Sequence, residues 1–143
     1  MADGFKINEQ GDDRTQMEIC RRHAENVILY EHFITDRTVI DCLAYSVYLY
    51  RRDKIKKSTM ENVEKYARHL LPSFTYMIYL PIEFDIVPDG VRSQDDVFRR
   101  EIDEIMSDPN TYTNITEKTI LFHRMSGSVV QRTNKVYELI KGF

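Results

Sequence analysis

An acidic and a basic side chain stand together directly after a short run that reads as a buried strand. Asp36 and Arg37 follow the run 32–35, and Asp41 lies one helical turn further on. An Asp at this place can hold Mg²⁺ through its oxygens or through water, and an adjacent guanidinium can grip a phosphate with two hydrogen bonds. The simpler interpretation is a helix start, with an exposed Arg37 and with Asp41 favoured by the helix dipole. Residue types alone favour that simpler interpretation.

A second group of charged side chains lies on a turn and on the helix expected after it. Asp89 and Arg92 belong to the turn sequence Pro-Asp-Gly-Val-Arg, and Arg99 follows on the helix. A loop that brings arginines over a transferring phosphate neutralises charge in the transition state. A surface turn and a solvated helix face explain the same residues, and the sequence alone favours this because acids balance the arginines. Those acids are Asp95, Asp96, Glu101 and Asp103.

A third group follows the last apolar run of the chain. Gly127 lies in the segment 124–128, and Arg132 comes about one helical turn later. A glycine-containing loop at this point can lie against a nucleotide base, with Arg132 facing the same region. A plain connection between a strand and a helix explains the segment equally well.

These groups are positioned by a regular series of expected elements. Apolar residues at helical spacing predict five helices; they cover about 14–29, 38–51, 58–71, 93–108 and 128–141. Short β-prone runs predict strands at 32–35, 75–80 and 118–123. Capping boxes are expected at Thr15 with Glu18, Ser58 with Glu61, and Ser128 with Gln131.

The order of these elements predicts the fold class. Short, continuously apolar strands that alternate with helices are typical of an α/β fold, in which helices flank a parallel sheet of about three strands. At 143 residues the chain should form a single domain, 1–143, with residues 1–13 expected to be flexible. Ligands of such sheets bind at the carboxyl ends of the strands, where all three groups of charged residues are expected.

Composition narrows the functional classes. A net charge of −3 argues against non-specific nucleic-acid binding, which needs a basic surface. No stretch approaches the roughly 18 apolar residues of a membrane helix, and the acidic, polar start is unlike a secretory signal. Cys20 and Cys42 fall in helical apolar patterns and are expected to be reduced core thiols of a cytoplasmic protein.

The three groups together resemble one family. The segment from Phe33 to Tyr45 is similar to the pattern of a strand, Asp-Arg, a second Asp and Leu-Ala-Tyr. That pattern is found in AAA-type ATPase and kinase domains similar to the nicotinamide-ribonucleotide kinase domain, which are common in phages. The segment 79–93 resembles the lid of that family, and the segment 126–132 resembles its final strand-to-helix connection. The likeness runs from about Thr15 to Ile140.

The resemblance implies phosphoryl transfer from ATP, with Mg²⁺, to a nucleoside or nucleotide acceptor. By the family pattern Asp36 is the metal and catalytic residue, while Arg37 and Arg92 are catalytic arginines. The remaining implied roles are acceptor binding by Asp41, Asp89 and Arg99, and cofactor binding by Gly127 and Arg132.

One large departure concerns the phosphate-binding loop, because a P-loop kinase-like fold begins with a strand and Gly-x-x-x-x-Gly-Lys-Ser/Thr. The only Lys-Ser/Thr pairs here, Lys57-Ser58 and Lys118-Thr119, follow no suitable glycine. The expectation is therefore a partial fold that cannot hold ATP alone. Three hypotheses stay open for the missing strand: a partner polypeptide supplies it, the chain pairs with a copy of itself, or the sheet is re-ordered.

Two functions follow from this interpretation. The first is the acceptor-site and lid half of a nucleoside or nucleotide kinase or AAA-type ATPase, inactive without a P-loop piece. The alternative is a non-catalytic binding or interaction protein derived from a P-loop kinase fold.

Overall fold

The computed structural model describes residues 4–85, 94–108, 110–113 and 121–142. In chain order the described elements are η1 (Asn8–Gln10), α1 (Asp13–Leu29), α2 (Val39–Tyr50), α3 (Lys57–Leu70), η2 (Leu71–Ser73), β1 (Tyr76–Tyr79), α4 (Asp96–Ser107), α5 (Asn110–Thr113), β2 (Leu121–Arg124) and α6 (Val129–Ile140). Most of the described chain is therefore helical, and the strands are four residues long each.

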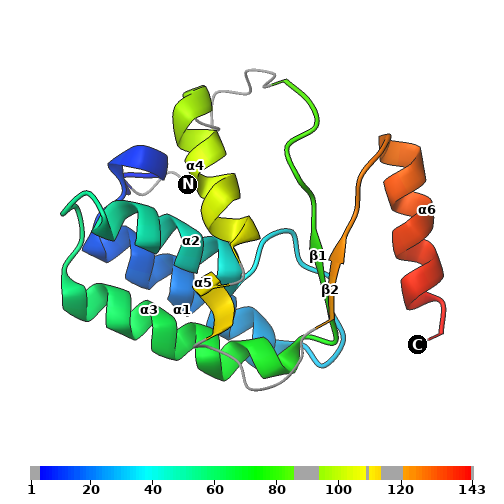
Figure 1. Ribbon diagram of the computed structural model, residues 1–143. Helices are drawn as coiled ribbons and strands as arrows, with labels where there is room; N and C mark the ends of the chain where they lie inside the picture. The colour runs from blue at the N-terminus through cyan, green and yellow to red at the C-terminus, as the bar shows by residue number, and fades with distance from the viewer. Residues whose placement is uncertain (1–3, 86–93, 109, 114–120, 143) are drawn as a thin grey trace.

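Four helices build the core. Helices α1, α2 and α3 lie against one another, and α4 crosses α2 (Figure 1). Helix α2 contacts all three of the others, which explains why its sequence is apolar on nearly every side. Leu43 and Leu49, at its centre, are 1% and 0% exposed.

Helices α3 and α4 each bury one face, which carries a row of apolar side chains. On α4 the stripe consists of Phe98, Ile102 and Ile105, at the spacing of one helix face. Phe98 packs edge to face against Tyr45 and Tyr48 of α2, with ring centroids 5.6 and 4.8 Å apart. Edge-to-face aromatic pairs add to the stability that burial alone provides. These contacts fix α4 on the helical core.

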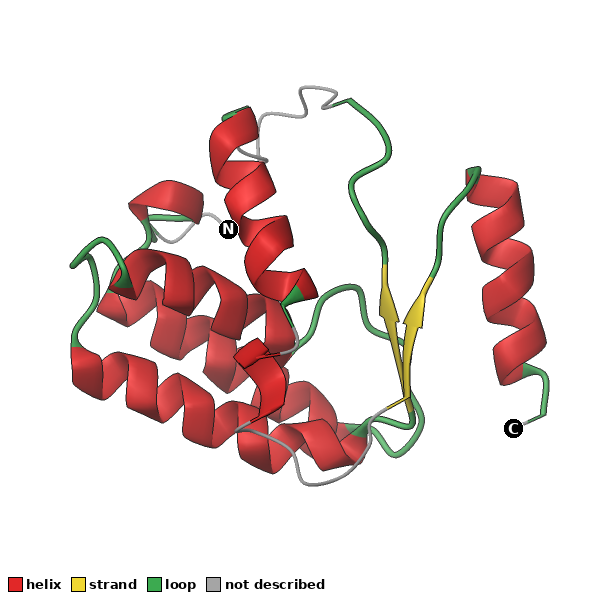
Figure 2. Cartoon of the chain, viewed as in Figure 1, coloured by secondary structure: helices red, strands yellow, loops and turns green. Residues whose placement is uncertain are grey.

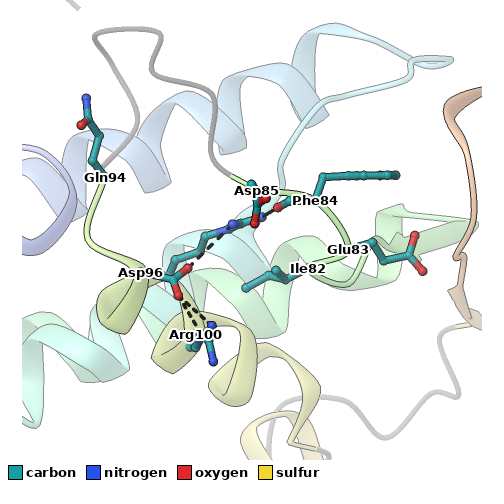
Figure 3. Close-up of a pocket in the computed structure, with 8 residues that line it drawn as sticks. Ile82, Glu83, Phe84, Asp85, Gln94, Asp96 and Arg100 are labelled. Atoms are coloured by element: carbon teal, nitrogen blue, oxygen red, sulfur yellow. Dashed lines mark hydrogen bonds and ion pairs between the residues drawn. The ribbon is translucent and has the colours of Figure 1, made fainter.

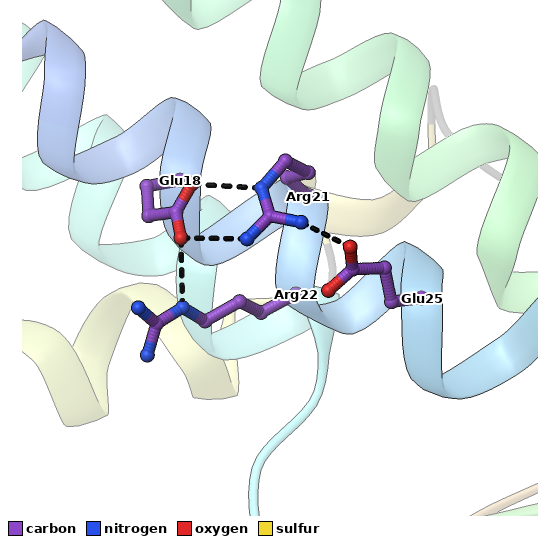
Figure 4. A network of polar contacts seen from close by, with 4 residues as sticks. All are labelled: Glu18, Arg21, Arg22 and Glu25. Atoms are coloured by element: carbon purple, nitrogen blue, oxygen red, sulfur yellow. Dashed lines mark hydrogen bonds and ion pairs between the residues drawn. The ribbon is translucent and has the colours of Figure 1, made fainter.

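The outer face of α1 carries a network of charged side chains (Figure 4). Glu18 accepts hydrogen bonds from Arg21 at 2.8 Å and from Arg22 at 2.9 Å, and Arg21 also pairs with Glu25. The two guanidinium groups lower the pKa of Glu18 to about 2. Ion pairs on the surface contribute little to stability. This network therefore makes the outer face of α1 polar but adds little to the stability of the core.

The two strands form a parallel pair beside the helices (Figure 2). Tyr76 is in register with Leu121 and Tyr79 with Arg124. Helix α6 lies on the far side of β2 (Figure 1), and none of its residues is buried. A hollow of about 560 Å³ lies between β2 and α6. Among the side chains that the structure describes, α6 thus adds none to the core.

The expectation of an α/β fold with about three strands is wrong. Among the described residues the sheet has two strands, so the structure is mainly helical and lacks the three-stranded parallel sheet of the expected kinase-like fold. The run 32–35 forms no strand, and Ile34 is 82% exposed. Periodicity cannot identify so short an apolar run as a strand, and the run pairs with neither of the described strands. The other two strand predictions are confirmed within the described residues, at 76–79 and 121–124.

The five expected helices are confirmed, whereas their predicted caps are correct in one case of three. Ser128 and Gln131 form the expected capping box of α6. Helix α1 is capped instead by Asp12, which accepts from the Thr15 amide at 3.0 Å. Helix α3 begins at Lys57 with no side-chain cap, so Ser58 lies inside it.

Candidate functional site

The carboxyl ends of both strands open into loops that lie side by side. Beyond the last paired residues, the Met125 amide donates to the carbonyl of Tyr79 at 3.0 Å, which continues the pairing into the loops. The loop after β1 contains Glu83 and Phe84, and the loop after β2 contains Gly127. In sheets of parallel strands this end is where ligands bind.

A carboxylate joins the two loops. The Gly127 amide donates to Oε2 of Glu83 at 2.8 Å. Gly127 has φ +105°, and a Cβ at this position would lie 2.6 Å from Oε1 of Gln131. That oxygen accepts the Ser128 amide at 2.8 Å in the α6 capping box. A side chain at position 127 would therefore disturb both the turn and the cap of α6.

Two arginines from different helices meet at Phe84. Arg99 of α4 donates from Nη2 to the Phe84 carbonyl at 2.6 Å. The guanidinium of Arg132 on α6 lies over the Phe84 ring, 5.1 Å from its centroid, a cation–π contact. Phe84 remains 53% exposed. We refer to Glu83, Phe84, Arg99, Gly127 and Arg132 as the strand-end cluster.

A shallow hollow of about 460 Å³ adjoins this cluster at the start of α4 (Figure 3). Asp96 pairs with Arg100 at 2.8 Å and lies 3.9 Å from Arg99. Acidic and basic side chains are therefore mixed on its wall rather than gathered by sign. The described lining residues are Ile82, Glu83, Phe84, Asp85, Gln94, Asp96, Arg99 and Arg100.

Tyr79 connects this end of the sheet to the helical core. Its hydroxyl donates to Oδ1 of Asp103 on α4. Burial, together with this hydrogen bond, raises the pKa of Tyr79 to about 12. The phenol is therefore protonated at all physiological pH values and keeps its donor. The guanidinium of Arg124 lies over the same ring, 5.5 Å from the centroid.

The Asp-Arg segment lies apart and makes mainly local contacts. Arg37 has a left-handed backbone, φ 74°, with its carbonyl accepting from the Thr35 hydroxyl at 2.9 Å. Its side chain donates to the Tyr45 hydroxyl at 3.4 Å. Asp41 accepts the Thr38 amide at 2.8 Å as part of a capping box. The simpler interpretation of Asp41, an acid that favours a helix start, thus describes its contacts.

These contacts do not build a magnesium site. Asp36 is exposed, and the second carboxylate of the segment, Asp41, already serves the cap of α2. Within the part of the chain that the structure describes, no three metal-binding side chains gather at one place. A magnesium ion at Asp36 would therefore take its other ligands from water and from substrate phosphates.

Of the six expected site residues that the structure describes, three come together and three do not. Arg99, Gly127 and Arg132 meet at the strand-end cluster. Asp36, Arg37 and Asp41 make their contacts elsewhere, with α2 and its preceding loop. Asp89 and Arg92 lie outside the described residues.

Glu83 and Phe84 are the cluster residues that the sequence analysis missed. The segment after β1 has no periodicity, so nothing marked individual side chains in it. The available signal was their position: they follow directly after a strand and the buried Pro81. Ligands bind at the carboxyl ends of parallel strands, so a carboxylate and an aromatic side chain in this segment are candidate site residues.

Comparison with known proteins identifies no relative of this chain. No family model matches the chain, and no curated protein or solved structure resembles it significantly. None of the helices in the described ranges has the length and apolar character needed to cross a bilayer.

Proposed function

We propose that this chain binds a phosphate-bearing nucleoside or nucleotide at the strand-end cluster. It is the acceptor-binding part of a phosphoryl-transfer protein, and a second polypeptide supplies the phosphate-binding loop. The observation that carries the proposal is that Arg99 of α4 and Arg132 of α6 both contact Phe84, while Gly127, just before α6, bonds the neighbouring Glu83.

The two arginines retain capacity for an anion. A guanidinium has five N–H donors; in Arg99, Nη2 donates to the Phe84 carbonyl and Nη1 lies 3.9 Å from Asp96, which leaves donors over. Arg132 contacts the Phe84 ring by a cation–π contact, which is not a hydrogen bond from its N–H donors. Two such groups can bind a phosphate with charge-assisted hydrogen bonds.

The exposed ring of Phe84 supplies the second half of the recognition. Arg132 covers the ring from one side, and more than half of the residue's surface remains open to solvent. Stacking on an aromatic ring contributes about 1–3 kcal/mol per base and accepts any base. A bound nucleotide would then place its phosphate near the two arginines and stack its base on Phe84.

The proposal is tested by calorimetric titration of the isolated chain with the four common nucleoside monophosphates and with inorganic phosphate. Replacing Arg99 or Arg132 by Ala should weaken monophosphate binding about tenfold or more, since each loses a charge-assisted bond. Arg68→Ala, an exposed arginine on α3, is the matched control and should bind like the wild type. Phe84→Leu should weaken the nucleotides but not inorganic phosphate.

Two results would contradict the proposal. If the Arg99 and Arg132 variants bind monophosphates as tightly as the wild type, the cluster is not the site. If the isolated chain by itself transfers phosphate from Mg·ATP to an acceptor, it needs no second polypeptide to provide the phosphate-binding loop.

A second candidate function is a non-catalytic interaction protein. It is favoured by α6, where Val129, Val130 and Tyr137 are each more than 60% exposed. It is also favoured by the sheet, whose outer edges pair with no other described strand. Light scattering on the purified chain distinguishes the two candidate functions. A stable dimer supports an interaction protein, and a monomer that binds nucleotides supports the first proposal.

A further inference from the structure

Four polar side chains are buried between α1 and α2. Gln16 and Cys20 come from α1, and Cys42 and Ser46 come from α2. Each is at most 2% exposed. We refer to these four residues as the thiol cluster. It lies in the helical core, and none of its residues belongs to the strand-end cluster.

The two sulfur atoms face one another directly. Sγ of Cys20 lies 3.0 Å from Sγ of Cys42, so no third side chain separates them. Sγ of Cys42 also lies 3.5 Å from the Gln16 carbonyl oxygen and 3.6 Å from its amide oxygen. That amide oxygen accepts a hydrogen bond from Ser46 at 3.0 Å as well.

We propose that Cys20 and Cys42 are a modification site: a hydroperoxide converts them into a reversible disulfide that joins α1 to α2. A disulfide has an S–S distance of about 2.05 Å, so the sulfurs must approach by roughly 1 Å. The residues are 22 positions apart on two adjacent helices, and the bond would fix the pairing of those helices. The Gln16 amide oxygen keeps Ser46 as its donor when the thiol protons are gone.

The reaction balances with hydrogen peroxide as the oxidant. One cysteine sulfur, as thiolate, attacks a peroxide oxygen; the O–O bond breaks, water leaves, and a sulfenic acid forms. The second sulfur attacks the sulfenic sulfur, the S–O bond breaks, and a second water carries away the remaining proton. The two thiols together lose two electrons and two protons, and the peroxide is reduced to two waters.

Burial makes the reaction selective. The contact with Cys20 and the surrounding core raise the pKa of the Cys42 thiol. The thiolate that attacks is therefore scarce in the closed structure, and large oxidants are kept out. Hydrogen peroxide is small enough to reach the pair during a local opening of α1, and the neighbouring thiol then completes the bond before further oxidation.

The test is peroxide treatment of the native chain, followed by alkylation in denaturant and mass spectrometry. The wild type should lose two hydrogens in mass and give a linked peptide pair that contains positions 20 and 42. Cys20→Ser and Cys42→Ser should give no linked pair within one chain. Reduction with dithiothreitol should restore both alkylation sites.

A second measurement separates preorganisation from mere reactivity. In glutathione redox buffers, the equilibrium fraction of the bridge gives an effective thiol concentration, which should be at least tenfold higher in the native protein than in urea. The oxidised protein should also have a higher Tm than the reduced protein. Separate oxidation of the two cysteines without a linked pair would overturn the proposal, and so would an effective concentration no higher in the native protein than in urea.

Discussion

The helical region, α1 to α4, and the strand region, β1, β2 and α6, differ in how they bury their side chains. In the helical region, α2 alone contains eight buried residues. Among the described side chains of the strand region, Met77 of β1 and Met125 just after β2 are buried, but no residue of α6 is. A hollow of about 560 Å³ separates β2 from α6, and Nε2 of His123 on its wall is buried without a hydrogen-bond partner among the described residues.

The difference teaches that the two regions have different sources of stability. A parallel strand pair is normally covered on both faces, and a sheet of two strands is marginal by itself. Here its link to the core includes the hydrogen bond from Tyr79 to Asp103. Apart from Arg99 of α4, the proposed ligand site lies in the weaker region, where a bound ligand or a partner chain can add the most stability.

The largest expected effect contrasts one buried and one exposed side chain. Leu43→Ala should lower the free energy of unfolding by about 2–5 kcal/mol, because it leaves a cavity in the helical core. Val130→Ala, at a position 68% exposed, should change it by less than about 0.5 kcal/mol. Urea unfolding followed by circular dichroism measures both. A Val130 variant as unstable as the Leu43 variant would mean that α6 is buried in solution, for example against a second copy.

A smaller effect should appear in the pH dependence. Burial lowers the pKa of His23 on α1 below its ordinary value of 6.5, although Asp41 acts in the opposite direction. The unfolded chain then binds a proton at His23 more readily than the folded chain, so this contribution to stability is complete above pH 6.5 and is lost as the pH falls through the folded pKa.

The matched variant for this prediction is His23→Gln. Relative to the variant, the wild type should lose stability between pH 7 and pH 5 in urea titrations. If stability depends on pH in the same way in both proteins, His23 has the same pKa in the folded and unfolded chain, and the predicted lowering of its pKa is wrong.

The sequence predicted the helical region well because its signal is local. The stripe of α4 and the apolar surface of α2 are properties of consecutive residues, so periodicity was sufficient. The run 32–35 failed because whether a short apolar run becomes a strand depends on partners elsewhere in the chain, and local sequence carries no record of them. Because this strand was predicted wrongly, the number of strands and the fold class were also predicted wrongly.

The site was predictable in part for the same reason. Gly127 was found because it follows the last expected strand, and Arg99 because it lies on the helix after the Pro-Asp-Gly turn; the structure brings both to the loop after β1. Glu83 and Phe84 were missed because their importance comes from contacts across loops. Asp41 was interpreted as an acid favoured at a helix start; the capping box that it forms with Thr38 was not predicted.

The most direct test of the contrast between the regions is native-state hydrogen exchange of the wild-type chain, followed by mass spectrometry. The account predicts that α2 amides exchange only through global unfolding, whereas α6 amides exchange through openings that cost at least about 2 kcal/mol less. If α6 and α2 exchange with the same free energy, the chain unfolds as one cooperative unit and the division into a stable helical region and a weaker strand region is wrong.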